Sequence, residues 1–353
     1  MESVKIGNRE VGGHHPCFVI GEIGLNHNGS VDMAKQLIDV AKEAGADCVK
    51  FQKRNVAGLA VESLLDADDN RFPEFGKTYR QIREHLEFDL KEYQELIAYT
   101  QKQGMIFLCT AFDVPSVEFL EGLGVAAYKV ASHGLTNLPL HKKLTQVGKP
   151  VILSTGMCTL EEIDAAVSIY TKGKTPLILL HCVSSYPQAL GESNLRMMDT
   201  LKERYQVPVG YSGHEMGFLP TVLSVARGAC AVERHITLDT SMVGFDHKLS
   251  LDPQALKSMI KEIRQAEQIL GSGAKAVSDR EQITRNKYHV SMVASRDIKA
   301  GEVIEEAMLE FKNPGTGLPP SRMKDVIKKK AKQNITKDTL ISLDMIEEQD
   351  DKE

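Results

Sequence analysis

The chain has 353 residues, of which 42% are hydrophobic and 26% charged, a composition typical of a folded globular protein. Its net charge of -5 provides no basic surface for nucleic acid, and no apolar run approaches the roughly 20 residues of a membrane-spanning helix. Residues 1–15 lack the apolar core of a signal peptide, so we expect a cytoplasmic protein without nucleic-acid or membrane partners.

Apolar, β-favouring runs alternate with segments of helical periodicity along most of the chain. The predicted strands are residues 18–23, 47–52, 105–110, 126–131, 150–154, 177–181, 207–211 and 229–232. The predicted helices are residues 31–44, 89–103, 115–122, 138–146, 160–170, 194–205, 218–227 and 253–270. A charged insertion without clear periodicity, residues 54–87, separates the second strand from the helix that follows it.

Strands that are each followed by a helix, repeated eight times, predict a closed (β/α)8 barrel, the TIM-barrel fold. The alternative is an open doubly wound sheet. That fold favours a phosphate-binding Gly-x-Gly-x-x-Gly sequence after the first strand, and this sequence is absent here.

The character of the chain changes after residue 270. Residues 271–286 form a polar joint without strong periodicity, and residues 287–353 contain short β-like runs around turns. We therefore expect a catalytic barrel at residues 1–270, a linker at residues 271–286 and a small β-rich domain at residues 287–353.

Polar or charged residues follow every predicted strand, at the face where (β/α)8 barrels hold their active sites. They are Glu22, Lys50, Gln52, Thr110, Lys129, Ser132, Ser154, His181, Ser184, Tyr186, Ser212, His214 and His235. Any one of them could be a solvated surface residue, and Glu22 could simply pair with Lys50 or Lys129. Polar residues at all eight strand ends together indicate a functional face.

Two of these residues, His214 and His235, follow the last two strands, which one short helix connects. A lone histidine is more often a hydrogen-bonded structural residue. Two neutral imidazoles at adjacent parallel strand ends, however, can share one divalent cation. We expect such a cation to act as a Lewis acid on a carbonyl group.

Lys50 and Lys129, with the hydroxyl groups of nearby Ser and Thr residues, predict a pocket for a molecule that carries both phosphate and carboxylate. Glu22 adds a free carboxylate on the same face. Beside a metal that polarises a carbonyl, this pocket indicates phosphoenolpyruvate condensing with an aldehyde.

Several segments closely resemble the sialic acid (N-acetylneuraminate) synthase family. They are GEIGLNHNG at residues 21–29, VKFQK at 49–53, YKVAS at 128–132, ILSTGM at 152–157, GYSGHE at 210–215 and ERH at 233–235. The last part of the chain resembles the antifreeze-like (SAF) domain of that family. The resemblance implies a synthase that condenses phosphoenolpyruvate with open-chain N-acetylmannosamine or a related hexose. Its products would be phosphate and a nine-carbon 2-keto acid, a nonulosonic acid.

The resemblance also implies roles for individual residues. His214 and His235 resemble the ligands of Mn²⁺ or Mg²⁺, and Glu22 resembles a residue that acts near the hydration of C2. The implied phosphoenolpyruvate contacts are Lys50, Thr110, Lys129, Ser132, Ser154 and Ser212. Tyr186 and Asp246 would line the sugar side, and Gln52 would help to position the substrate. Members of the family are homodimers in which the C-terminal domain of one subunit covers the barrel mouth of its partner.

The chain departs from the family pattern on the sugar side. His133 and Gly134 stand where many members have Gly-Glu, Ser184 replaces an Asn, and Asn313 replaces an Arg that reaches the partner's sugar site. We therefore expect weak preference for N-acetylmannosamine, with another hexose such as mannose used comparably. Two alternatives stay open, namely a related 2-keto-3-deoxy acid synthase that uses another aldose, and a catalytically inactive sugar-binding or ice-binding protein.

Overall fold

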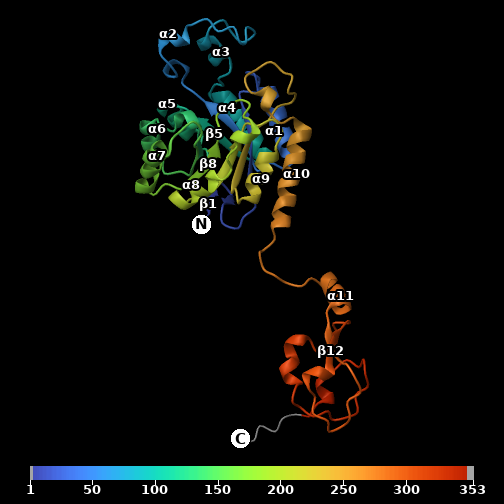
Figure 1. Ribbon diagram of the computed structural model, residues 1–353. Coiled ribbons are helices and arrows are strands. Elements are labelled where there is room, and N and C mark those ends of the chain that lie inside the picture. Colours follow the sequence, from blue (N-terminus) through green and yellow to red (C-terminus); the bar gives the residue numbers. More distant parts are fainter. Residues whose placement is uncertain (1–2, 348–353) are drawn as a thin grey trace. The chain divides into compact units, whose positions relative to one another are not determined.

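The structure is a computed structural model that describes residues 3–347 (Figure 1). The chain forms two compact units, Met1–Gly271 and Ser272–Glu353. Residues 348–353, part of the charged tail that we assigned to the second domain, lie outside the described residues. No helix among the described residues is both long and apolar enough to cross a membrane.

Within the described chain, eight parallel strands of the first unit close into a barrel. They are β3 (Phe18–Gly24), β4 (Cys48–Lys53), β5 (Ile106–Ala111), β6 (Tyr128–Val130), β7 (Val151–Ser154), β8 (Leu177–Cys182), β9 (Val209–Gly213) and β10 (Ala231–His235). The barrel is closed because β10 pairs in parallel with both β9 and β3. The predicted (β/α)8 fold is therefore confirmed, and the open sheet is excluded.

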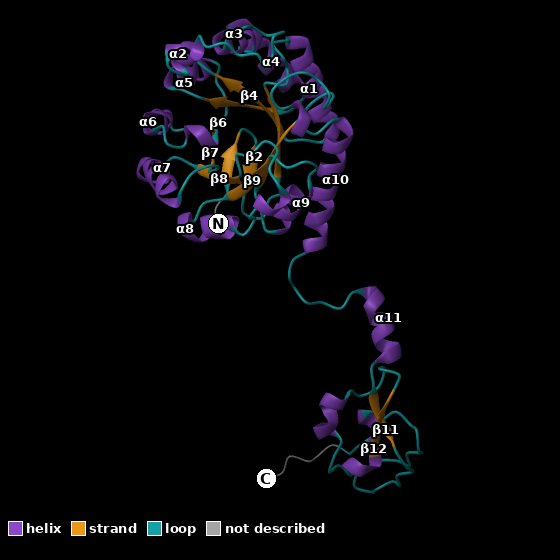
Figure 2. Cartoon of the chain, turned by 45° about the horizontal axis from the view of Figure 1, so that its top comes forward, coloured by secondary structure: helices purple, strands orange, loops and turns teal. Residues whose placement is uncertain are grey.

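Helices surround the barrel strands (Figure 2). They are α1 (Val31–Ala44), α4 (Leu90–Lys102), α5 (Val114–Gly122), α6 (Leu138–Val147), α7 (Leu160–Gly173), α8 (Met197–Tyr205), α9 (Leu219–Ala226) and α10 (Pro253–Leu270). Local sequence sets their ends. Ser30 caps α1 by accepting a hydrogen bond from the Met33 amide, and Gly45 ends that helix with a left-handed φ of 90°. The apolar faces of the helices bury against the outward side chains of the strands.

A hairpin that the sequence pattern did not reveal precedes the barrel. Strands β1 (Val4–Ile6) and β2 (Arg9–Val11) pair in antiparallel register. Their buried side chains join one apolar cluster with residues at the first positions of several barrel strands, such as Phe18 and Cys48. The hairpin thus fills the amino end of the barrel. Its strands of three residues each are too short to give a recognisable period.

The insertion at residues 54–87 contains two short helices, α2 (Glu62–Leu65) and α3 (Tyr79–His85). Ile82 and Leu86 pack with Leu25, which follows β3, and with Phe245, which follows β10. The insertion is therefore anchored to loops at the carboxyl end of the barrel, where the predicted site residues lie.

The second unit has a small apolar core of its own, which includes Met292, Ile304 and Ile341. Strands β11 (Ser291–Ala294) and β12 (Leu309–Lys312) pair in antiparallel register within it. Helix α11 (Asp279–Tyr288) crosses the boundary between the predicted linker and the predicted domain, although the sequence indicated no helix there. This helix begins with a capping box and buries none of its residues, which explains why it lacks an apolar period.

Candidate active site

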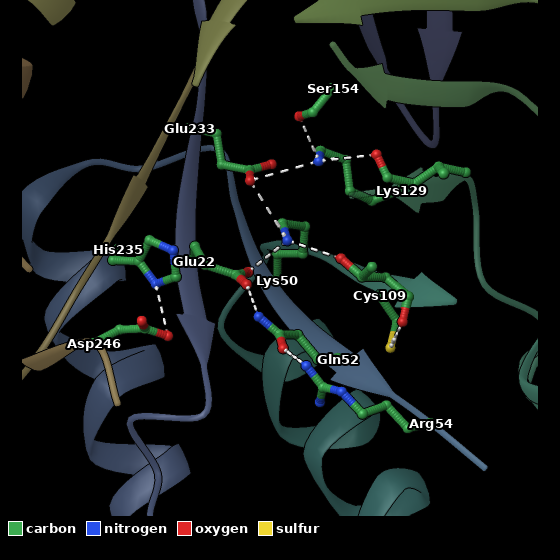
Figure 3. Close-up of polar contacts among 12 residues, drawn as sticks. Glu22, Lys50, Gln52, Arg54, Cys109, Lys129, Ser154, Glu233, His235 and Asp246 are labelled. Atoms are coloured by element: carbon green, nitrogen blue, oxygen red, sulfur yellow. Dashed lines mark hydrogen bonds and ion pairs between the residues drawn. The ribbon is translucent and has the colours of Figure 1, made fainter. Parts of the chain in front are cut away.

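Buried charged side chains from four barrel strands, β3, β4, β6 and β10, meet at the carboxyl end of the barrel (Figure 3). Lys50 Nζ lies 2.7 Å from Glu22 Oε2 and 3.5 Å from Glu233 Oε1. Lys129 Nζ lies 3.7 Å from the same Glu233 oxygen. One carboxylate is thus shared between two lysines, and a second carboxylate faces only Lys50.

Burial and charge act in opposite directions on these groups. Burial lowers the pKa of Lys50, but Glu22 and Glu233 outweigh it and leave that pKa above its ordinary value. Burial also lowers the pKa of Lys129, and here Glu233 compensates only in part, so the pKa of Lys129 stays below its ordinary value. Burial raises the pKa of Glu233, but Lys129 and Lys50 together reverse that shift and lower it. Of the two lysines, Lys129 therefore has less compensating negative charge beside it and is better placed to bind an anion.

Hydroxyl groups surround the two lysines. Lys50 donates a hydrogen bond of 2.9 Å to Thr110 Oγ1, and Lys129 donates one of 2.7 Å to Ser154 Oγ. Ser132 Oγ accepts from the Gly156 amide at 2.9 Å. A Cβ atom on Gly156 would lie 2.8 Å from that oxygen and 2.4 Å from Ser184 Oγ, and both distances are too short for a real contact. Only glycine at this position lets the loop come so close to the two hydroxyl groups.

One cavity of about 460 Å³ brings the predicted residues together. The predicted barrel positions that line it are Glu22, Lys50, Gln52, Thr110, Lys129, Ser132, Ser154, Ser184, Tyr186, Ser212, His214, His235 and Asp246. His181 does not line it, because its ring is buried and its Nε2 lies 2.8 Å from the Ser193 carbonyl oxygen. Asn313, the remaining predicted residue, lies in the second unit directly after β12, so its sugar contact stays a prediction.

His214 and His235 face each other across this cavity, with ring centroids 5.6 Å apart, and the Tyr186 ring lies 4.2 Å from His214. His214 Nδ1 donates to the Val183 carbonyl at 2.9 Å, which leaves its Nε2 lone pair free. Burial, with the neighbouring His235, lowers the pKa of His214 to about 3, so this ring is neutral. His235 Nδ1 is buried without a hydrogen-bond partner and lies 3.7 Å from Asp246 Oδ2.

This donor set fits a divalent cation. Within residues 3–347, no three His, Cys, Asp or Glu side chains form a ready metal-binding cluster, so the protein offers two imidazoles. Two protein ligands leave coordination positions open for substrate or water oxygens, as catalytic rather than structural metal sites do. Asp246, which would not itself bind the cation, can orient the His235 ring.

Three charged residues that line the cavity were missed as candidates by the sequence interpretation, namely Glu233, Arg54 and Arg83. The predicted eighth strand ended at residue 232, whereas β10 continues to His235. Glu233 and His235 are two residues apart on a strand and therefore share a face, and this alternation could have revealed Glu233. Arg54 begins the irregular insertion and Arg83 lies within it, where no period indicated which side chains point inward.

The chain is thus a (β/α)8 barrel with buried lysines and paired histidines in a pocket at the strand ends, where enzymes of this class hold their active sites. The chain belongs to the NeuB family, whose family model matches residues 37–275. The SAF domain model matches residues 289–347, which confirms the expected class of the second domain.

Named relatives agree with this assignment. The chain is 40% identical to N,N'-diacetyllegionaminic acid synthase of Campylobacter jejuni, covering 92% of this chain and 98% of the relative. It is 37% identical to N-acetylneuraminate-9-phosphate synthase of Mus musculus, with 96% and 95% covered. The crystal structure of N-acetylneuraminic acid (sialic acid) synthetase from Leptospira borgpetersenii superimposes with a TM-score of 0.70. That protein is 36% identical, with 80% of this chain and 95% of that chain covered. The predicted family is confirmed.

Proposed function

We propose that this protein is a nonulosonic acid synthase, which condenses phosphoenolpyruvate with an open-chain hexose or hexosamine. The observation that carries the proposal is the cavity in which Lys50 and Lys129 lie beside two facing imidazoles. The names of the relatives support a synthase of this class, and they differ in the acid formed, so the acceptor sugar is a separate question.

Phosphoenolpyruvate would bind between the two lysines. Lys129 shares its one neighbouring carboxylate with Lys50, so an incoming anion would neutralise charge that the protein leaves uncompensated. The hydroxyl groups of Ser154 and Ser212 in the cavity wall add donors for phosphate or carboxylate oxygens.

The acceptor aldehyde would lie near His214 and His235. These residues would hold Mn²⁺ or Mg²⁺, which supplies Lewis-acid polarisation of a carbonyl oxygen when bound. Tyr186, packed against His214, and Asp246, beside His235, would border the sugar.

The reaction forms a bond between C3 of phosphoenolpyruvate and the aldehyde carbon, whose oxygen gains a proton and becomes a hydroxyl group. Water adds at C2, phosphate leaves with the former enol oxygen, and C2 becomes the ketone of the product. Glu22 would accept the proton of the water that adds at C2. Its carboxylate is held for this role by Lys50 and by Gln52, whose Nε2 donates to Glu22 Oε1 at 2.5 Å.

We further propose, from the family resemblance, a cytoplasmic homodimer in which the SAF domain of one subunit covers the barrel of its partner. A related synthase acting on another aldose is the second candidate, because the replacements His133, Ser184 and Asn313 concern the sugar side.

The test is consumption of phosphoenolpyruvate with a panel of aldoses, with and without Mn²⁺, followed by mass analysis of the product. We expect metal-dependent turnover and a product three carbons longer than the aldose. Lys129→Ala should raise the KM for phosphoenolpyruvate about ten- to a hundredfold, since a charge-assisted contact contributes roughly 1.5–3 kcal/mol. Lys143→Ala, which removes an exposed lysine paired with Glu118, is the matched control. No turnover with any aldose would leave only the inactive sugar-binding alternative.

A further inference from the structure

Two arginines in the cavity have no role in the function proposed above. Arg54 follows β4, and Arg83 lies in α3 of the insertion. Arg54 is only 7% exposed, yet its Nη1 has no hydrogen-bond partner. Arg83 Nε and Nη1 are likewise buried without partners. Unsatisfied buried guanidinium donors are costly, and a ligand that accepts hydrogen bonds would satisfy them.

The negative charge near these arginines is too small to balance them. Glu87 Oε1 lies 3.6 Å from Arg54 Nη1, but Glu87 Oε2 also accepts a hydrogen bond of 3.0 Å from Lys53 Nζ. Asp69, which lies near Arg83, is already paired with Arg71. Burial and the positive charge of Arg83 both lower the pKa of Arg54, as expected for two cations that share too little negative charge.

Aromatic rings fix the planes of both guanidinium groups. Arg54 Cζ lies 3.9 Å from the centroid of the Phe112 ring, and Arg83 Cζ lies 4.5 Å from that of Phe245. Stacking occupies the faces of a guanidinium group and leaves its edge N–H groups available. Three unpaired edge nitrogens, from two stacked groups, suit the several oxygens of a phosphate group.

Hydrogen bonds connect Arg54 to the proposed reaction centre. Arg54 Nη2 donates to Gln52 Oε1, and Gln52 donates to Glu22 (Figure 3). In the same view Lys129 lies at the opposite end of this series of side chains. Phe245, which stacks on Arg83, immediately precedes Asp246, the neighbour of His235.

We propose that the acceptor sugar carries a phosphate monoester at the end remote from its aldehyde, and that Arg54 and Arg83 bind this phosphate. The inference rests on the proposed function and names the substrate class of the same site. His133, which stacks on Phe112, borders this subsite as a neutral donor, because burial and Arg54 lower its pKa to about 4.

The first experiment compares kcat/KM for mannose with that for mannose 6-phosphate, and N-acetylmannosamine with its 6-phosphate, at saturating phosphoenolpyruvate. We expect the phosphorylated sugar of each pair to be preferred about ten- to a hundredfold. Mannuronate, which carries a carboxylate in place of the phosphate, tests whether any negative charge at that end of the sugar is enough. Equal use of phosphorylated and neutral sugars, or a preference for mannuronate over mannose 6-phosphate, would overturn the assignment.

The second experiment changes the arginines. Arg83→Gln should raise the KM for the phosphorylated acceptor about tenfold or more, with the KM for phosphoenolpyruvate within about twofold of wild type. Arg80→Gln is the matched control, because Arg80 lies on the same helix but pairs with Asp66 at the surface. Arg54→Lys, which keeps the charge, should retain more phosphate preference than Arg54→Gln. Equal losses in Arg83→Gln and Arg80→Gln would contradict the subsite.

A third measurement separates failure of the subsite from failure of the proposed reaction. Calorimetric titration with mannose 6-phosphate and with mannose reports binding without turnover. If no aldose consumes phosphoenolpyruvate, binding of mannose 6-phosphate that Arg83→Gln weakens and Arg80→Gln does not would still support the subsite. Binding that is equal for both sugars would exclude it.

Discussion

Glu233 is the residue on which the charge balance of the two buried lysines depends. Its Oε1 is the nearest carboxylate oxygen to Lys129 and also lies 3.5 Å from Lys50. Glu22 partly compensates Lys50, so loss of Glu233 would affect Lys129 more strongly. The ionisation of Lys129 is therefore tied to one carboxylate.

This dependence predicts a pH effect. Lys129 is charged below its pKa, so phosphoenolpyruvate affinity should be lost as pH rises through that lowered value. Glu233→Gln removes the group that raises the pKa of Lys129, so the alkaline limb of kcat/KM for phosphoenolpyruvate should move to lower pH. The measurement is the pH profile of both proteins. A limb that moves to higher pH in Glu233→Gln would contradict this account.

The paired histidines predict a requirement for a divalent cation. His214→Ala and His235→Ala each leave one imidazole, too few protein ligands for a stable site, so turnover should fall to background and Mn²⁺ binding should weaken. His14→Ala, at an exposed position of the barrel unit, is the control. Full activity of either site variant in the presence of a chelator would rule out the metal assignment.

Among elements, the amino-terminal hairpin has a structural role separate from the chemistry. Ile6 is fully buried in the cluster at the amino end of the barrel, whereas Lys5 of the same strand points to solvent. Ile6→Ala should lower the free energy of unfolding by about 2–5 kcal/mol, as expected for a large-to-small core substitution. Urea unfolding measures it, with Lys5→Ala as the control. A raised KM for phosphoenolpyruvate in folded Ile6→Ala would show that the hairpin also shapes the site.

Elements also explain which parts of the structure could be predicted from the sequence. The barrel strands and helices have regular periods and glycine or capping signals, as at Ser30 and Gly45, so their order was predictable. The site residues at the strand ends were predictable because (β/α)8 barrels hold their active sites at the carboxyl ends of their strands. The unpaired donors of Arg54 and Arg83 depend on contacts between the irregular insertion and a distant loop, and no local pattern encodes such contacts.

At the scale of the whole molecule, the proposed function assigns the chemistry to the barrel unit and part of the sugar selection to the second unit. The proposed lid role predicts that a protein ending at Gly271 folds and binds phosphoenolpyruvate but condenses it poorly. Asn313→Arg in the full chain should raise the preference for N-acetylmannosamine over mannose about tenfold, since Arg adds a charge-assisted donor that Asn lacks. Kinetic measurements on both proteins test the proposed lid role. Undiminished condensation by the truncated protein, or an unchanged sugar preference in Asn313→Arg, would contradict it.

The hairpin that fills the amino end of the barrel also bears on the order of events during turnover. Lys129 is only 1% exposed, whereas Tyr186 at the carboxyl face is 53% exposed, so the proposed substrates would enter from that face. A sugar bound beside Tyr186 would stand between the lysines and solvent. Phosphoenolpyruvate would then have to bind before the sugar, and phosphate released beside the lysines would leave after the sugar acid. The closed amino end of the barrel would therefore impose an order on both binding and release in the proposed reaction.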